Sequence, residues 1–198
     1  MSSSFPKTSV TTKYILKPII TAMLKALDKP NAKIRVCQKP LLGSVSEALK
    51  WERIKAIIDS YAQVDLFLLC VDRDGDAHRQ QQLRKLENKA NEMLAGTGRT
   101  LLAENAWQEI EVWVLAGQDL SKTWKTWNWQ EIRNEIHPKE TYFDPFVKQY
   151  FATNQSLPGP GNGRKLLAAE ASKRYDRIRK LCPEDIENLE IRIHTWLH

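Results

Sequence analysis

Apolar residues recur at helical spacing in four parts of the chain. Residues 14–27, 45–62 and 77–95 each place apolar side chains on one face, and residues 107–117 form a shorter apolar run that ends at a glycine. Pro18 is typical of a first helical turn, so regular helix is expected to begin near it. The pattern predicts four helices in the first two thirds of the chain.

Between these helices lie three segments with strand character. Residues 33–37 alternate and contain β-branched side chains, and residues 64–71 are continuously apolar, as in a strand buried on both faces of a parallel sheet. Residues 99–103 follow a glycine turn and predict a third, short strand. Strands that alternate with helices predict an α/β fold, with a parallel sheet flanked by helices.

The last part of the chain has a different pattern of apolar and polar residues. Residues 1–117 carry the α/β pattern, whereas residues 118–198 predict a helical C-terminal extension packed on that core. Within it, residues 164–181 form an amphipathic helix whose outer face includes Lys173 and Arg177. The extension also holds a tryptophan cluster at positions 124, 127 and 129, which serves either core packing or stacking on bases.

Charge is unevenly spread. The net charge is +6, of which residues 1–39 contribute +7, residues 40–163 contribute −3 and residues 164–180 contribute +5. An acidic centre between basic ends could hold a metal in the middle and phosphate at its flanks. Solvated, lysine-rich helix faces are the alternative. No apolar run reaches the roughly 18 residues of a membrane span, and the start resembles no signal peptide, so a cytoplasmic protein with no membrane partner is expected.

Three aspartates follow the apolar run 64–71 directly. Asp72 and Asp74 are two residues apart and would point the same way in an extended segment, while Asp76 follows a glycine that lets the chain turn. Carboxylates this close repel unless a cation neutralises them. Because ligands bind at the carboxyl ends of parallel strands, the pattern predicts a site for Mg²⁺ or Mn²⁺ there.

Other interpretations of these aspartates fit less well. An EF-hand loop starting at Asp72 would need a glycine and a glutamate where Ala77 and Leu83 stand. A haloacid-dehalogenase-type phosphatase would place a small hydroxyl residue where Asp76 stands. A polar turn that caps the next helix explains Asp76 alone and leaves Asp72 and Asp74 without a role.

A second acidic group follows the next predicted strand. It comprises Glu104, Glu109 and Glu111, in the sequence AENAWQEIEVW. Glu111 has apolar neighbours, which for a charged side chain indicates a partner or a metal, and Glu109 is either a further ligand or an exposed helix acid. Glu109 and Glu111 therefore join the three aspartates as candidate metal ligands.

The sequence FLLCVDRDGD, followed by AENAWQEIEVWVLAG, resembles a Toprim-like domain-of-unknown-function family of prokaryotes. That family is related to the Toprim nuclease domain of the overcoming-lysogenization-defect proteins. The resemblance covers about residues 14–117 and extends more weakly to 181. It implies a Toprim-like fold and a divalent-metal nuclease, with Asp72 and Asp74 in the family's D-x-D motif and Glu111 as its later acid.

The resemblance also implies a biological setting, and the sequence departs from the family at one point. The context is prokaryotic defence or DNA processing, with DNA rather than RNA as substrate and an ATPase as a possible partner protein. Toprim domains carry a further glutamate after their first strand, yet here no acidic residue precedes Asp28. The sequence therefore predicts weak or lost nuclease activity, or a nucleic-acid- or protein-binding subunit beside the ATPase.

A basic stretch at the start of the last long helix completes the candidate residues. Glycines precede Arg164 and Lys165, and a helix start with glycines and cations can hold phosphate. Lys165 is the candidate catalytic cation, since it could stabilise charge that develops on a metal-bound phosphate. Arg164, Lys173 and Arg177 are the candidate nucleic-acid contacts. A flexible linker into an ordinary helix is the alternative.

Overall fold

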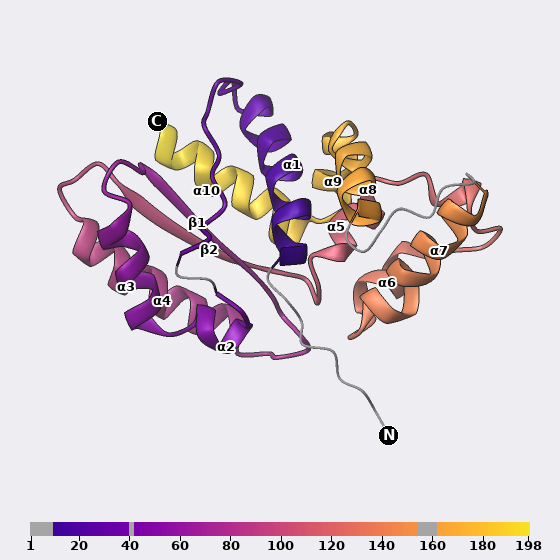
Figure 1. The fold of residues 1–198 in the computed structure, drawn as a ribbon, viewed down its shortest axis with the longest axis horizontal. Coiled ribbons are helices and arrows are strands. Elements are labelled where there is room, and N and C mark those ends of the chain that lie inside the picture. The colour runs from indigo at the N-terminus through magenta and orange to yellow at the C-terminus, as the bar shows by residue number, and fades with distance from the viewer. Residues whose placement is uncertain (1–9, 40–41, 154–161) are drawn as a thin grey trace.

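The computed structural model describes residues 10–39, 42–153 and 162–198 of the chain. Two strands lie among many helices (Figure 1). In chain order the elements are α1 (Val10–Ala26), α2 (Val45–Ala48), α3 (Trp51–Ser60), β1 (Leu66–Asp72), α4 (Arg79–Leu94), β2 (Thr100–Ala106), α5 (Glu111–Ala116), the 3₁₀ turn η1 (Leu120–Lys122), α6 (Trp129–Asn134), the π-helical turn η2 (Lys139–Phe143), α7 (Asp144–Thr153), α8 (Asn162–Ser172), α9 (Tyr175–Leu181), the π-helical turn η3 (Pro183–Glu187) and α10 (Asn188–Leu197).

Strands β1 and β2 pair in parallel, with Leu66 opposite Thr100 and Asp72 opposite Ala106. Helix α4 supplies the crossover that a parallel pair requires. Because the strands run the same way, the carboxyl ends of both lie at one edge of the sheet. The α/β fold is confirmed, and so are the strands expected near 64–71 and 99–103.

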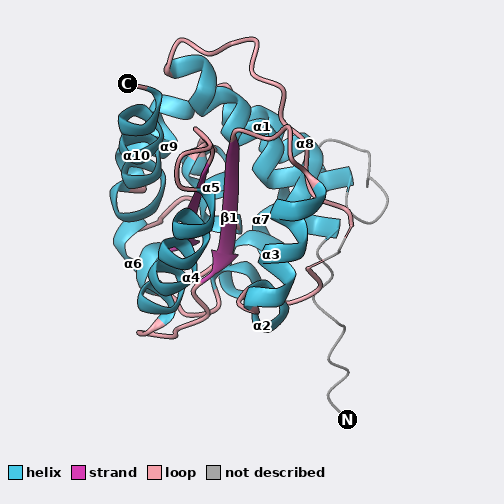
Figure 2. Cartoon of the chain, turned by 90° about the vertical axis from the view of Figure 1, so that its left-hand side faces the viewer, coloured by secondary structure: helices cyan, strands magenta, loops and turns pink. Residues whose placement is uncertain are grey.

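Both faces of the strand pair are covered, which explains the continuous apolar run of β1. Successive side chains point to opposite faces. Figures 1 and 2 show α2, α3 and α4 on one side of the strands and α1 and α10 on the other. The larger core receives Leu66, Leu68, Cys70, Leu102 and Ala106, and the smaller core receives Phe67, Leu69, Val71, Leu101 and Ala103.

The strand predicted over residues 33–37 is wrong: the described segment 32–38 forms no strand, and the sheet of the described chain has two strands. Ile34 packs against the larger core and Cys37 against the smaller one. The alternation of apolar side chains therefore reflects a connection that serves two cores, without the backbone pairing of a third strand.

Helix α1 starts earlier than the sequence predicts, and Pro18 lies inside it. An internal proline removes one backbone hydrogen bond and costs about 3 kcal/mol. Ile15, Ile19 and Met23 are at most 1% exposed, and burial of three large apolar side chains offsets that cost. Packing therefore overrides the local preference of the proline.

Two other expected helices are interrupted. The helix predicted over 45–62 divides into α2 and α3, and that over 164–181 divides into α8 and α9. At the second break the backbone of Arg174 leaves helical geometry, and Arg174 Nη1 donates to the carbonyl oxygen of Gly117 at 2.9 Å. This hydrogen bond holds the chain to Gly117 at the break between α8 and α9.

Residues 118–198 contribute to the same large core as residues 1–117. Helix α8 packs along α1, and Leu189 and Ile193 of α10 are fully buried. Trp124 and Trp129 pack against this core, whereas Trp127 is 38% exposed. The division at residue 117 stays a prediction.

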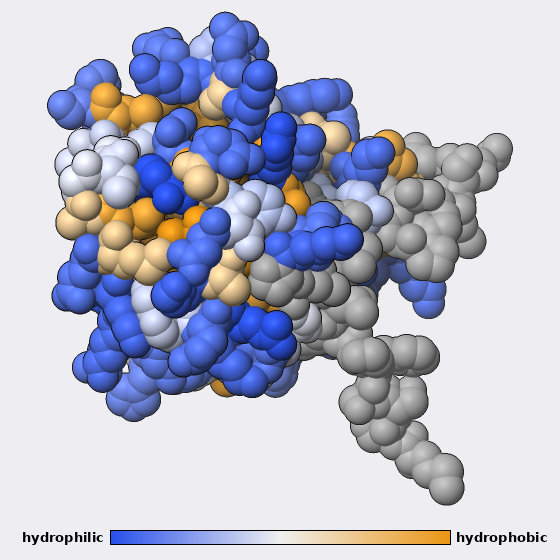
Figure 3. Space-filling view, turned by 60° about the vertical axis from the view of Figure 1, so that its left-hand side comes forward, coloured by the Kyte–Doolittle hydropathy of each residue, from blue (hydrophilic) through white to orange (hydrophobic). Residues whose placement is uncertain are grey.

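No helix in the described part of the chain is long and apolar enough to cross a bilayer. Figure 3 shows a face dominated by hydrophilic side chains, which border an apolar area on two sides.

Candidate functional site

Asp72 ends β1 and turns its carboxylate toward the loop that follows β2. Oδ1 of Asp72 accepts the backbone N–H of Ile110 at 2.9 Å. Burial and the negative charges of Glu111, Asp74 and Glu109 raise the pKa of Asp72, the hydrogen bond from Ile110 lowers it, and the resulting pKa is about 7. The ionised form of Asp72 is therefore unfavourable among these acids, and a bound cation would stabilise it.

The loop after Asp72 is fastened to the loop after β2 through one residue, Gln108. The carbonyl oxygen of Gln108 accepts the N–H groups of Arg73 at 2.8 Å and Asp74 at 3.1 Å, and its side-chain Oε1 accepts that of Gly75 at 3.0 Å. Asp74 and Gln108 both have left-handed backbones, with φ of 52° and 73°. Non-glycine residues seldom adopt this conformation, and such strain is found chiefly at functional sites.

Glu109 lies in the loop before α5 and Glu111 begins that helix, and the two residues are 1% and 8% exposed. Oε2 of Glu109 accepts the backbone N–H of Lys139 at 2.8 Å. Burial raises the pKa of Glu111, Arg164 and Lys139 lower it, and Glu109 raises it. Glu111 is the first residue of α5, where the helix dipole favours negative charge.

Two cationic side chains, Arg164 and Lys139, lie near Glu111, and both contact the carboxylate of Asp144. Arg164 Nε is buried and lies 3.6 Å from Glu111 Oε1, and it has no hydrogen-bond partner among the described residues. Arg164 Nη2 lies 3.4 Å from Asp144 Oδ1, and Lys139 Nζ lies 3.3 Å from Asp144 Oδ2. The start of α8 is thus held against the start of α5.

The contact between α5 and α8 depends on small side chains. A Cβ at Gly117 would lie 2.5 Å from the Cβ of Ala171, closer than two such atoms can approach. Next to it, Gln118 Nε2 donates to the carbonyl oxygen of Leu167 at 2.9 Å. These contacts fix α8 and, through it, the position of Arg164.

The other predicted residues lie apart from this cluster. Asp76 lies in the turn before α4, where Oδ1 accepts the N–H of His78 at 2.8 Å and Oδ2 lies 3.4 Å from Arg79 Nη2. Lys173 pairs with Glu170 at 3.4 Å on the exposed surface, and Arg177 lies on α9. Lys165 is exposed and lines a cavity between α1 and α8.

Glu104 lies on β2 but is held by other partners. Its Oε2 accepts from Asn188 Nδ2 at 2.7 Å and from Arg192 Nη1 at 3.3 Å. Sequence reasoning overlooked Gln108, Lys139 and Asp144, since no motif marks them. A glutamine between a strand and two acids was the signal available for Gln108.

The donor set suits a hard divalent cation in part. Carboxylate oxygens are the ligands that Mg²⁺ and Mn²⁺ prefer. Asp72 has no ion-pair partner among the described residues, and Glu111 is the charge that raises its pKa most. Within the described ranges, however, no three His, Cys, Asp or Glu side chains are grouped to hold one ion. The residues therefore fit an ion bound by few carboxylates, with water completing its shell.

Comparisons of the chain with protein-family models, curated proteins and solved structures found no match. A function is therefore argued from the geometry of the carboxylates and their cationic neighbours.

Proposed function

We propose that this protein is a divalent-metal-dependent nuclease or related phosphodiesterase, in which Asp72 and its acidic neighbours Asp74 and Glu111 are the candidate ligands of Mg²⁺ or Mn²⁺ and water completes the shell of the ion. The observation that carries the proposal is the setting of Asp72. Its carboxyl group is surrounded by three acids that raise its pKa, and no described base forms an ion pair with it. Binding a divalent cation would remove that repulsion.

The residues of the chain would divide the work as follows. A bound ion would activate water and neutralise charge on a phosphodiester. The N–H of Ile110 orients Asp72, and the N–H of Lys139 directs Glu109. Arg164 is the described cation nearest Glu111, and Lys165 follows it on α8. Both cations are candidates for stabilising a phosphate in its transition state.

The resemblance of the sequence to Toprim-like proteins supports DNA as the substrate and prokaryotic defence or DNA processing as the setting. Arg164, Lys173 and Arg177 are the proposed contacts to the nucleic acid. Arg164 lies at the carboxylates, whereas Lys173 and Arg177 lie on or after the later turns of α8. The latter two would contact phosphates some distance from the bond that is cut.

A second function is favoured by a specific pair of observations. No acidic residue precedes Asp28, and the described residues hold no group of three potential ligands for one ion. A site with few ligands positions the attacking oxygen loosely, and small displacements can cost on the order of 100-fold in rate. The alternative is an impaired nuclease fold that binds nucleic acid or protein beside an ATPase partner.

One experiment separates the two functions. Supercoiled plasmid is incubated with wild type, Asp72→Ala/Asp74→Ala or the exposed control Asp176→Asn, with Mn²⁺ or Mg²⁺. Nicking by wild type and control that the double variant loses would support the nuclease. We expect slow nicking that is faster with Mn²⁺, because Mg²⁺ demands stricter octahedral geometry. Plasmid binding without nicking by any protein would support the binding subunit.

A further inference from the structure

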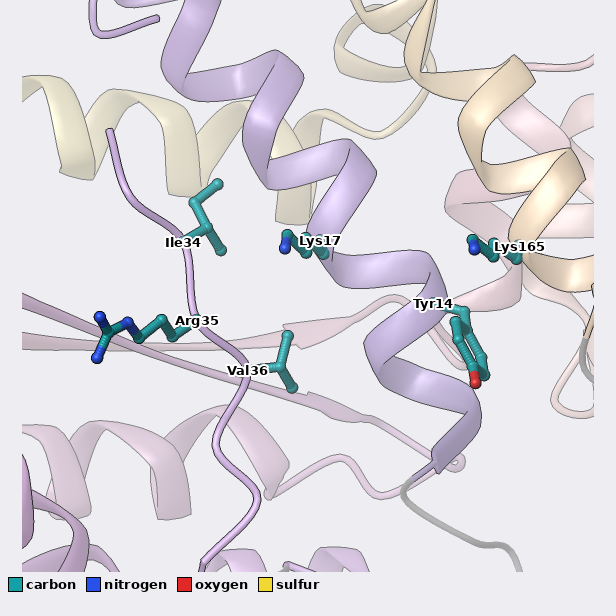
Figure 4. A pocket seen from close by; sticks show the side chains of 6 residues that line it. All are labelled: Tyr14, Lys17, Ile34, Arg35, Val36 and Lys165. Carbon is teal, nitrogen blue, oxygen red and sulfur yellow. The ribbon is translucent and has the colours of Figure 1, made fainter. Parts of the chain in front are cut away.

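A cavity of about 510 Å³ lies between α1, the segment 32–39 and the start of α8. Figure 4 shows the six residues that line it: Tyr14, Lys17, Ile34, Arg35, Val36 and Lys165. We refer to it as the basic groove. Its volume lies within the roughly 300–1,000 Å³ of ligand pockets. Its lining includes no acid.

The cations of the basic groove come from three separate elements. Lys17 belongs to α1, Arg35 to the segment 32–39 and Lys165 to α8, and all three are exposed. Among the described residues, none of the three forms an ion pair, although most acids of this chain have a basic neighbour. In Figure 4 the side chain of Arg35 points away from α1, so the three cations are spread around the groove. Positive charge around a groove without a counter-charge favours an anionic ligand.

The apolar residues of the groove indicate which class of anionic ligand fits it. Ile34 and Val36 point toward α1 in Figure 4, and the ring of Tyr14 lies between α1 and α8. A free phosphate would leave these side chains without a contact. A single nucleic-acid strand offers both phosphates and exposed bases, whereas a duplex keeps its bases stacked inside.

The groove adjoins the candidate metal site along α8. Lys165 lines the groove, and its neighbour Arg164 lies 3.6 Å from Glu111. Consecutive residues of α8 therefore belong to the groove and to the border of the candidate metal site. We infer that the basic groove binds single-stranded nucleic acid and leads it toward the carboxylates. The destination of the strand rests on the proposed function, whereas the binding does not.

Binding is tested without metal, so that it is independent of cleavage. Fluorescent oligo(dT) of 12 nucleotides and a duplex of equal length are titrated in EDTA with wild type and Lys17→Glu/Arg35→Glu. Lys165 is left intact because it is a candidate for the chemistry. Lys85→Glu/Lys125→Glu makes the same change of charge at two exposed lysines outside the groove. Thermal melting checks that all variants fold.

The expected result is tighter binding of the single strand than of the duplex, and a loss of at least 10-fold in the groove variant alone. The slope of log K against log salt should fall by about 1.4, since each phosphate contact of a single strand contributes about 0.7. Equal losses in both variants, preference for duplex, or equally tight binding of polyglutamate would overturn the inference.

The cleavage assay distinguishes this failure from failure of the proposed function. If wild type nicks plasmid but the groove variant binds oligo(dT) like wild type, the groove inference fails and the nuclease stands. If no protein nicks plasmid but the groove variant loses oligo(dT) binding, the nuclease fails and the groove stands.

Discussion

The backbone N–H of Ile110 donates to Asp72 Oδ1 at 2.9 Å and joins the ends of the two strands. It is the one hydrogen bond recorded for the Asp72 side chain within the described residues, and it does not outweigh burial and acidic neighbours, which raise the pKa of Asp72 to about 7. Ionised Asp72 is therefore a cost to the fold in the absence of a cation.

This cost predicts how stability depends on pH. Between the ordinary pKa of 3.8 and the folded value of about 7, the native state keeps a proton that the unfolded chain releases. The contribution of Asp72 to stability therefore falls as pH rises through that window. In EDTA, Asp72→Asn should melt about 2–4 °C above wild type at pH 8, on the order of 1 kcal/mol, and match it near pH 4.

Asp176→Asn, an exposed change, should show no such pH-dependent difference. A lower melting temperature for Asp72→Asn at pH 8 would mean that the ionised carboxylate already has a stabilising partner.

The sequence predicts correctly those elements whose formation depends mainly on their own residues. Helix α4 was predicted with its buried residues Leu83, Leu86, Ala90 and Leu94, because a strong helical period needs no tertiary information. Strand β1 was predicted because a short, continuously apolar run is typical of a strand covered on both faces. The clustering of acids at one edge follows from the parallel pairing, which places the ends of consecutive strands together.

Features that depend on distant parts of the chain were not predictable. Arg164 reaches Glu111 only because α8 packs on α5, and no spacing in the sequence encodes that contact. The left-handed backbone of Gln108 is decided by the N–H groups it accepts from residues 73–75. Residues 33–37 alternate as a strand would, but their apolar side chains pack against two different cores.

Gly117 should be intolerant of a side chain. A Cβ there would lie 2.5 Å from the Cβ and 2.6 Å from the Cα of Ala171, so α8 would have to move. Overpacking of this kind costs about 1–3 kcal/mol. Gly117→Ala should lower the melting temperature, whereas Gly43→Ala, with no neighbour within 4 Å, should change it little. Equal melting of both variants would show that α8 adjusts freely.

Asp185 should be a major contributor to the packing of η3 on the core. It is 1% exposed, and its Oδ2 accepts from the Trp107 backbone N–H at 2.8 Å, Trp113 Nε1 at 2.7 Å and Arg133 Nη1 at 3.2 Å. Asp185→Asn leaves the buried charge of Arg133 with Glu184 as its acidic partner, at 2.6 Å from Nη2 and half exposed. Breaking a buried ion pair typically costs about 3–5 kcal/mol, and the remaining pair with Glu184 should hold the loss to the lower end of that range. Urea unfolding followed by tryptophan fluorescence measures the loss.

The double variant Arg133→Met/Asp185→Asn provides the control. Removing both charges should destabilise the protein by less than the sum of the two single changes, because neither charge is left unpaired. Additive losses would show that the two side chains do not interact.

Calorimetric titration with Mn²⁺ and Mg²⁺ tests the metal site most directly. At pH 8, wild type and the exposed control Asp176→Asn should bind one ion per chain with equal affinity. Asp72→Asn, Asp74→Asn and Glu111→Gln should each weaken binding by about 10-fold or more, since each removes a negatively charged ligand. Equal affinity for wild type and all three site variants, or no binding by wild type, would contradict a metal site at these carboxylates.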